Sequence, residues 1–219
     1  MTGLEFGAVL DRLPQFWAGT IQTVWLAVAS FTVAIGIGLC LALARLSRRR
    51  TFSWASRLIT DIVRGTPALV QVLLIYFGLP QLGIQIDAAV AGILALGLNS
   101  GAYIGEIVRA GVLSIDRGQM EAARSIGMSH AKAMRRIVLP QAFRVVIPPV
   151  TNEATTLVKG TSLLSVISIT ELTRVGQQVM GVTFRPIEAF LAVAAVYLVM
   201  ITFLSQASTL LERRLAYAS

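Results

Sequence analysis

Long apolar stretches alternate with short polar segments along most of the chain. Five stretches have the character of transmembrane helices, at about residues 17–46, 62–79, 88–112, 143–165 and 187–211. A helix that rises about 1.5 Å per residue needs roughly 20 residues to cross the hydrocarbon core of a bilayer. Because lipid-exposed backbone must satisfy its own hydrogen bonds, the pattern predicts an all-α bundle of five transmembrane helices. The second stretch is the weakest, since it is preceded by an amphipathic turn around Arg57 and Asp61.

The composition favours an integral membrane protein. Of the 219 residues, 55% are hydrophobic and 14% are charged, and the mean hydropathy is +0.73. No segment has the composition of a separate soluble domain, so we expect one transmembrane domain over residues 1–219 with a cytoplasmic loop at 114–141. The N-terminal residues lack the pattern of a cleaved secretory signal, so we expect the first apolar stretch to remain as an anchor.

Positive charges are distributed unevenly between the two sides of the predicted bundle. Of the 19 Lys and Arg residues, only Arg12, Arg174 and Arg185 fall on the side of the N-terminus, and Lys159 falls within a span. An excess of Lys and Arg marks the cytoplasmic side of a membrane protein. We therefore expect the N-terminus outside and the C-terminus in the cytoplasm. The net charge of +8 is interpreted as a topology signal, not as evidence of nucleic-acid binding.

The segment between the third and fourth spans has strong local helix signals. Residues 121–124 favour a helix, and Gly127 can end it in a left-handed conformation. Ser129 can cap a second helix, which Pro140 would end or kink. The pattern predicts two short helices around a tight corner, and the small side chains of the first suit insertion into a partner's groove. A solvated loop that keeps this segment cytoplasmic is the alternative interpretation.

A spaced motif runs through this loop: E-A-A, three residues, G, nine residues and I-x-L-P, at Glu121, Ala122, Ala123, Gly127, Ile137, Leu139 and Pro140. The motif resembles the signature loop of permease subunits of bacterial ABC importers. Three further segments resemble the polar amino acid uptake branch of that family, which carries histidine, arginine, glutamine or opines. These are 64-RGTPALVQVLLIYFGLP-80, 97-GLNSGAYIGEIVRAGVLSIDRGQMEAARSIGMS-129 and 158-VKGTSLLSVI-167.

The resemblance implies a fold, a location and a set of partners. It implies a type I importer permease in the bacterial inner membrane, with residues 121–127 as a coupling helix docked on a dimer of ATPase subunits. ATP and Mg would be bound by that ATPase, and this chain, which has no G-x-x-x-x-G-K-[ST] motif, would hold no cofactor, no metal and no catalytic residue. A second permease subunit, identical or related, and an external amino-acid-binding protein would complete an importer that works by alternating access.

The fourth predicted span carries a polar face, which includes Asn152, Glu153, Thr156 and Lys159. Glu153 lies near its middle, where a carboxylate costs about 2.5–3.5 kcal/mol even on the gentler insertion scale. We therefore expect it to face protein, water or solute. Pro148 and Pro149 predict a place where this span bends. The third span contributes three polar side chains at a similar depth, Asn99, Ser100 and Tyr103.

These residues together predict a polar path on which Glu153 pairs with the ammonium group of an amino acid, with a weak preference for cationic solutes. Two alternatives are structural: a salt bridge between Glu153 and Lys159, and packing roles for Asn99 and Thr156. A third is functional, an ion-coupled secondary transporter or channel with Glu153 as its ion site. An intramembrane enzyme is disfavoured because the only Cys or His in the spans is Cys40.

Other features of the spans are expected to be structural. Glu106 and Arg109, three residues apart near the inner end of the third span, are predicted to form an ion pair. Four glycines, Gly36, Gly38, Gly101 and Gly105, are interpreted as positions of close helix packing.

Overall fold

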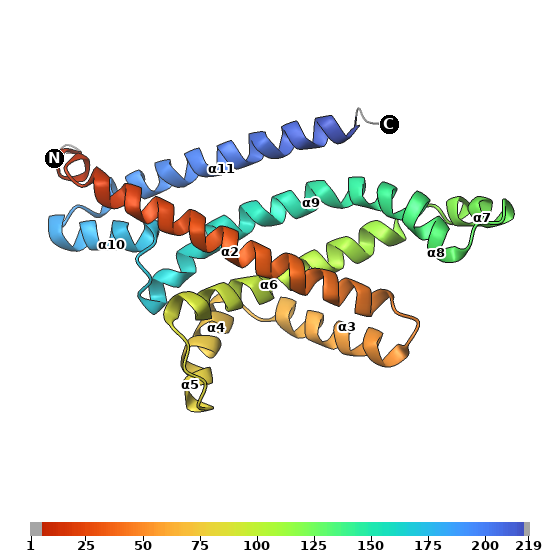
Figure 1. Ribbon diagram of the computed structural model, residues 1–219. Helices are drawn as coiled ribbons and strands as arrows, with labels where there is room; N and C mark the ends of the chain where they lie inside the picture. Colours follow the sequence, from red (N-terminus) through yellow and green to blue (C-terminus); the bar gives the residue numbers. More distant parts are fainter. Residues whose placement is uncertain (1–5, 217–219) are drawn as a thin grey trace.

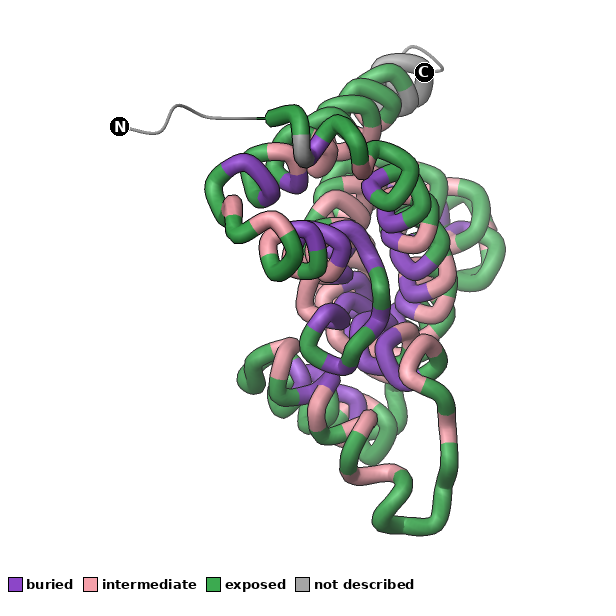
Figure 2. Tube along the Cα trace, turned by 90° about the vertical axis from the view of Figure 1, so that its left-hand side faces the viewer, coloured by how far each residue is buried: buried purple, intermediate pink, exposed green. Residues whose placement is uncertain are grey.

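The computed structural model describes residues 6–216, and this part of the chain is an elongated bundle of helices without a strand (Figure 1). A short helix, α1 (Gly7–Leu10), precedes the first long one. Helices α7 and α8 lie at one end of the bundle and α10 lies at the other, which is also the end of the N-terminus. Buried positions gather where the helices face one another, and exposed positions cover the outside (Figure 2).

The centre of the bundle is the pair α2 (Leu13–Leu46) and α6 (Ala88–Leu113). Glycines allow the close approach: a Cβ atom at Gly101 would lie 2.9 Å from Ile37, and one at Gly38 would lie 2.7 Å from Ile104. Gly105 is similarly crowded by α2, so these three predicted packing positions are confirmed. Gly36 faces open space, and its predicted packing role is wrong.

The second predicted span is broken. Helix α3 (Arg50–Gly65) folds back against α2 and α6, and the chain then turns by 105° into α4 (Ala68–Leu73), η1 (Leu74–Gly78) and α5 (Leu79–Gln81). Thr66 is extended because a proline disfavours helical backbone at the residue before it, and Pro67 is also extended. The predicted second span, 62–79, therefore contains the break and is not a single helix.

The loop at 114–141 forms the expected corner. Helix α7 (Arg117–Ser125) ends at Gly127, whose φ is +80°, and Met128 N–H donates to the Ala123 carbonyl at 3.1 Å. This bond and the left-handed glycine are features of a Schellman motif. Ser129 caps α8 (His130–Ala133), but this helix continues through the π-helical turn η2 (Met134–Val138) into α9. Pro140 comes just after the π-helical turn η2 within this continuous helical run and does not end it, so the predicted helix end at Pro140 is wrong.

The chain beyond Pro140 forms the remaining long helices. Helix α9 (Leu139–Gly160) packs against α6 and α11 and continues as the 3₁₀ helix η3 (Thr161–Ile167). Pro148 and Pro149 lie inside α9 without ending it, and a bend of this helix at the two prolines stays a prediction. A short connection leads to α10 (Leu172–Thr183) and then to α11 (Pro186–Ala216), the last long helix.

Length and composition identify only some of these helices as membrane spans. Helices α2, α6 and α11 are long and apolar enough to cross, and α3 with the segment to Gln81 qualifies as a bent pair. Helix α9 does not qualify because two prolines, polar residues and three charged side chains, Arg144, Glu153 and Lys159, lower its hydropathy. These criteria therefore leave the predicted count of five unconfirmed.

Candidate functional site

Glu153 lies on α9 beside α6. Its carboxylate is half-buried and accepts a hydrogen bond from the hydroxyl of Ser100, which is buried in α6. The predicted neighbourhood of these two residues is therefore present in the structure. A carboxylate in this position is held by a neighbouring helix and still keeps acceptor capacity for another donor.

The rest of the polar face of α9 lies on the outside of the single chain. Asn152, Thr156 and Lys159 are exposed and lie on the same side as Glu153. The Thr156 hydroxyl donates to the Asn152 carbonyl at 3.2 Å, so its proton is used within the helix. No ion pair among the described residues joins Glu153 to Lys159, and the alternative of a structural salt bridge between them is not supported.

Asn99 and Tyr103 face a different part of the molecule. The Asn99 amide donates to Gln71 Oε1 at 3.2 Å, and the Arg64 guanidinium lies over the Tyr103 ring, 5.0 Å from its centroid. Both contacts join α6 to helices that flank the break: Gln71 lies in α4 and Arg64 lies in α3. The structure thus brings Ser100 to Glu153 but directs its neighbour Asn99 away, and a solute-contacting role for Asn99 and Tyr103 stays a prediction.

Gln71 is a residue that the sequence analysis missed. Its buried amide donates to the Val63 carbonyl at 2.7 Å and to Thr66 Oγ1 at 2.8 Å, while its oxygen accepts from Asn99. It satisfies carbonyl groups that the broken helix leaves without an intrahelical donor. A signal was available, since an amide four residues after Pro67 in an apolar run has to find partners.

The residues of the loop motif separate into two groups. Glu121, Ala122 and Gly127 are exposed at the end of the bundle, whereas Ala123 is buried against the following helical segment. The remaining motif residues, Ile137, Leu139 and Pro140, lie in η2 and the start of α9, with Ile137 half-buried. Ile126, which the sequence analysis did not single out, is 78% exposed at the corner. An apolar residue directly before a left-handed glycine is the signal that could have identified it.

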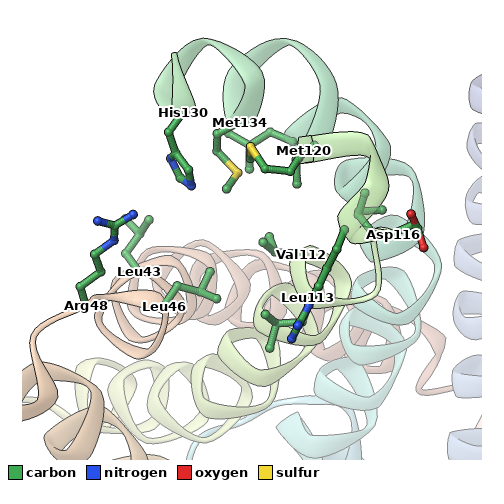
Figure 3. A pocket seen from close by; sticks show the side chains of 13 residues that line it. Leu43, Leu46, Arg48, Val112, Leu113, Asp116, Met120, His130 and Met134 are labelled. Atoms are coloured by element: carbon green, nitrogen blue, oxygen red, sulfur yellow. The ribbon is translucent and has the colours of Figure 1, made fainter. Parts of the chain in front are cut away.

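A hollow of about 650 Å³ lies beneath this corner (Figure 3). The ends of α2 and α6 supply an apolar floor that includes Leu46 and Val112, and Met120 and Met134 approach from the corner. Arg48 and His130 point toward each other across one side of the hollow. The hollow lies on the inner side of the corner, and the outward side of α7, with Glu121 and Ala122, is exposed and accessible to a partner.

Glu171, which the sequence analysis also missed, organises the opposite end of the bundle. Its fully buried carboxylate caps α10, accepting from the N–H groups of Thr173 and Arg174 at 2.8 Å each and from the Tyr197 hydroxyl at 3.1 Å. Burial raises the pKa of Glu171, and these hydrogen bonds partly offset the increase. The acid joins α10 to α11, and its available signal was a Glu directly before an apolar helix start.

A helical bundle with a polar face along one long helix and an exposed helical corner at one end has the features of a membrane transport subunit. Residues 34–217 match the family described as "Binding-protein-dependent transport system inner membrane component", and the chain belongs to this family. It is thus a permease subunit of the ABC transporter class, a transporter component rather than an enzyme, and the resemblance in the loop is confirmed.

Relatives match over nearly their whole length. The chain is 37% identical over 213 residues to the "Arginine transport system permease protein ArtQ" of Bacillus subtilis, covering 97% of each chain. It is also 37% identical over 213 residues to the "Glutamine transport system permease protein GlnP" of Escherichia coli, covering 96% of this chain and 97% of that one.

Solved structures share the fold. A chain of the "Crystal structure of an amino acid ABC transporter with histidines" is 40% identical, with a TM-score of 0.93 over 97% of this chain and 100% of that chain. A chain of the MetNI methionine ABC transporter, at 19% identity, has a TM-score of 0.73 over 97% of this chain and 99% of that chain, which shows the fold alone. The type I permease fold that the sequence predicted is confirmed.

Proposed function

We propose that this chain is the membrane-spanning subunit of an ATP-driven importer that carries polar amino acids across the bacterial inner membrane. The named cargoes of its relatives, arginine and glutamine, support this class of solute. Five elements would cross the membrane: α2, the broken span α3–α5, α6, α9 with η3, and α11. In this arrangement the N-terminus is outside and the C-terminus is cytoplasmic, as the distribution of Lys and Arg predicts.

The proposed complex has three kinds of partner. A dimer of ATPase subunits would receive the corner formed by residues 121–127, and it would bind ATP and Mg. A second permease subunit, a copy of this chain or a related one, would face the exposed polar side of α9. An external amino-acid-binding protein would deliver the solute at the end that carries α10. The family description, which names binding-protein-dependent transport, supports the last of these.

The observation that carries the proposed solute path is the position of Glu153. Its carboxylate is held by Ser100, while Asn152, Thr156 and Lys159 line the same outer side of α9. A polar strip exposed on an isolated membrane helix is costly unless it faces water, solute or another protein. A second subunit would enclose this strip, and Glu153 would then pair with the ammonium group of the passing amino acid.

Transport would follow an alternating-access cycle. ATP-driven closure of the ATPase dimer would move the two α7 corners toward each other and open the bundle outward, and hydrolysis would return it inward. In this cycle the permease helices adopt two arrangements. The ATPase shifts the equilibrium between them because it binds nucleotide with a different affinity in each.

Uptake by the reconstituted complex tests the role of Glu153. We expect Glu153→Gln to lower arginine uptake about tenfold or more, because a lost charged hydrogen bond is worth roughly 1.5–3 kcal/mol. Asp61→Asn is the matched control, since Asp61 is an exposed carboxylate on α3. Unchanged arginine uptake by Glu153→Gln, in a complex that hydrolyses ATP normally, would remove the proposed role.

The ion-coupled alternative makes an opposite prediction for the permease alone. Proteoliposomes that contain only this chain, and its permease partner where one exists, should be inactive under our proposal whatever ion gradient is imposed. Uptake driven by such a gradient without an ATPase would instead support a secondary transporter.

A further inference from the structure

Four arginines surround a hollow at the corner between α2 and α3, at the same end of the bundle as α7. Arg45 and Arg48 come from the end of α2 and the connection, and Arg50 and Arg57 come from α3. The hollow measures about 350 Å³, and its lining is completed by three further residues, Ser47, Ser53 and Trp54. At about 30 Å³ per water molecule, it has room for a solvated headgroup-sized ligand.

The positive charge of this arginine pocket is only partly balanced. Arg45 lies 3.6 Å from Glu106, and Glu106 is also paired with Arg109 at 2.9 Å. Arg57 lies 3.5 Å from Asp61, but both side chains are about two-thirds exposed, and such exposed pairs contribute little. No carboxylate in the described chain pairs with Arg48 or Arg50. The pocket therefore has the charge to bind an anion.

Helix α3 carries an exposed apolar strip that begins beside the pocket. Trp54 is 67% exposed, and its strip also includes Phe52, Leu58, Ile59 and Ile62. The inward side of α3 is small and polar, and the Ser56 hydroxyl donates to the Leu41 carbonyl at 2.8 Å. Arginines and a tryptophan at the start of an outward apolar strip are typical of a helix end that lies at the boundary between headgroups and acyl chains.

The available donors match the oxygen atoms of a phosphate group. Guanidinium groups donate in a planar fork that fits phosphate oxygens, which favours Arg over Lys at such a site. The Ser53 hydroxyl donates to the Arg45 carbonyl at 3.2 Å, so its proton is used. The Ser47 oxygen accepts from the Arg49 N–H at 3.2 Å, which leaves the Ser47 hydroxyl proton for a ligand.

We propose that this arginine pocket binds the phosphate of an anionic phospholipid, with the acyl chains lying along the apolar strip of α3. The strip favours a lipid over a soluble phosphate, because a soluble anion would leave it without a partner. The assignment of this lipid to the cytoplasmic leaflet rests on the membrane orientation given under the proposed function, whereas the binding site itself does not. Arg48 also lines the hollow beneath α7, so a bound lipid would contact a residue that the two hollows share.

Lipid retention by the purified complex tests this site independently of transport. We expect the wild type in detergent to retain phosphatidylglycerol in preference to phosphatidylcholine, as counted by native mass spectrometry. The double variant Arg48→Gln, Arg50→Gln should bind phosphatidylglycerol about tenfold more weakly, since each tenfold loss of affinity corresponds to about 1.4 kcal/mol. Arg135→Gln, Arg136→Gln is the matched control, with the same loss of charge at exposed positions of η2.

Competition separates the two sources of phosphate. Glycerol phosphate and inorganic phosphate should displace little of the bound lipid at equal concentration. Equal loss of lipid in the control variant, equal retention of the two lipids, or displacement by free phosphate would each overturn the proposal. Because lipid counts need no uptake, failure of the transport experiment would leave this result interpretable.

Discussion

At the scale of single residues, buried polar side chains determine how the helices are joined. Gln71, Glu171 and Ser100 each connect two or more elements through bonds that the apolar pattern does not reveal. A buried polar group that loses its partner costs about 1–3 kcal/mol, which is comparable to a substantial part of the stability of a domain. These side chains are therefore sensitive points for substitution.

The link between Gln71 and Asn99 can be measured by a double-mutant cycle. Gln71→Ala should lower the free energy of unfolding in detergent by about 1–3 kcal/mol, because the Val63 carbonyl loses its donor. Combined with Asn99→Ala, the loss should be less than additive. Gln119→Ala, at an exposed position on α7, is the control and should change the stability by about 0.5 kcal/mol or less. Strict additivity would show that the two side chains do not interact.

Glu171 should make part of the stability depend on pH. Because burial raises its pKa in the folded protein, the native state favours the protonated acid. The corresponding stability is present below the usual Glu pKa of about 4.3 and is lost as the pH rises through the raised value. Thermal unfolding measured upward from about pH 4 should show this decline in the wild type. Glu171→Gln should flatten it, and an equal decline in both proteins would assign it to other groups.

At the scale of elements, backbone chemistry explains both the successes and the errors of sequence reading. Gly127 was identified correctly because a left-handed helix end depends on the glycine itself. Pro140, Pro148 and Pro149 all lie within helical segments, and none of them ends a helix. One lies in a first turn after a π-helical turn, and α9 accommodates the other two within a packed bundle. A proline removes one backbone donor, and the packing around it determines whether the helix ends there.

The conformation of Gly127 should matter for docking of the ATPase. Gly127→Ala places a side chain at a φ of +80°, which costs about 1 kcal/mol and disturbs the end of α7. Gly36→Ala is the control, since Gly36 is helical and faces open space. We expect only the first variant to weaken the binding of the ATPase subunit to the solubilised permease. Equal binding by both variants would argue against a docking role for this corner.

At the scale of the whole molecule, membrane topology is the feature that the proposed cycle most requires. The segment between α5 and α6 should be outside and the α7 corner should be cytoplasmic. Ile84 and Ile126 are both exposed and represent the two sides. In a Cys40→Ser background, a membrane-impermeant maleimide should label Ile84→Cys in intact cells and Ile126→Cys only after the membrane is opened.

The same labelling carries its own control, because opening the membrane should expose both cysteines equally. Labelling of Ile126→Cys in intact cells would reverse the predicted orientation. Labelling of both positions from outside would mean that they lie on the same side of the membrane, which contradicts the proposed crossing by α6.

The sequence by itself determined the helical class, the membrane location and the family, since these depend on composition, on period and on local motifs such as residues 121–140. It also correctly predicted the pair of Glu106 with Arg109, because three residues along a helix bring two side chains together. It placed Ser100 at the depth of Glu153 as well.

Only the tertiary structure decided which neighbour each polar side chain meets. Asn99 and Ser100 are adjacent in sequence, yet one bonds to the broken span and the other to α9. The 105° turn and the buried capping acid Glu171 likewise depend on contacts between distant segments. Hydrophobic pattern specifies which side of a helix is buried, whereas hydrogen-bond partners depend on how the helices are rotated and placed against one another.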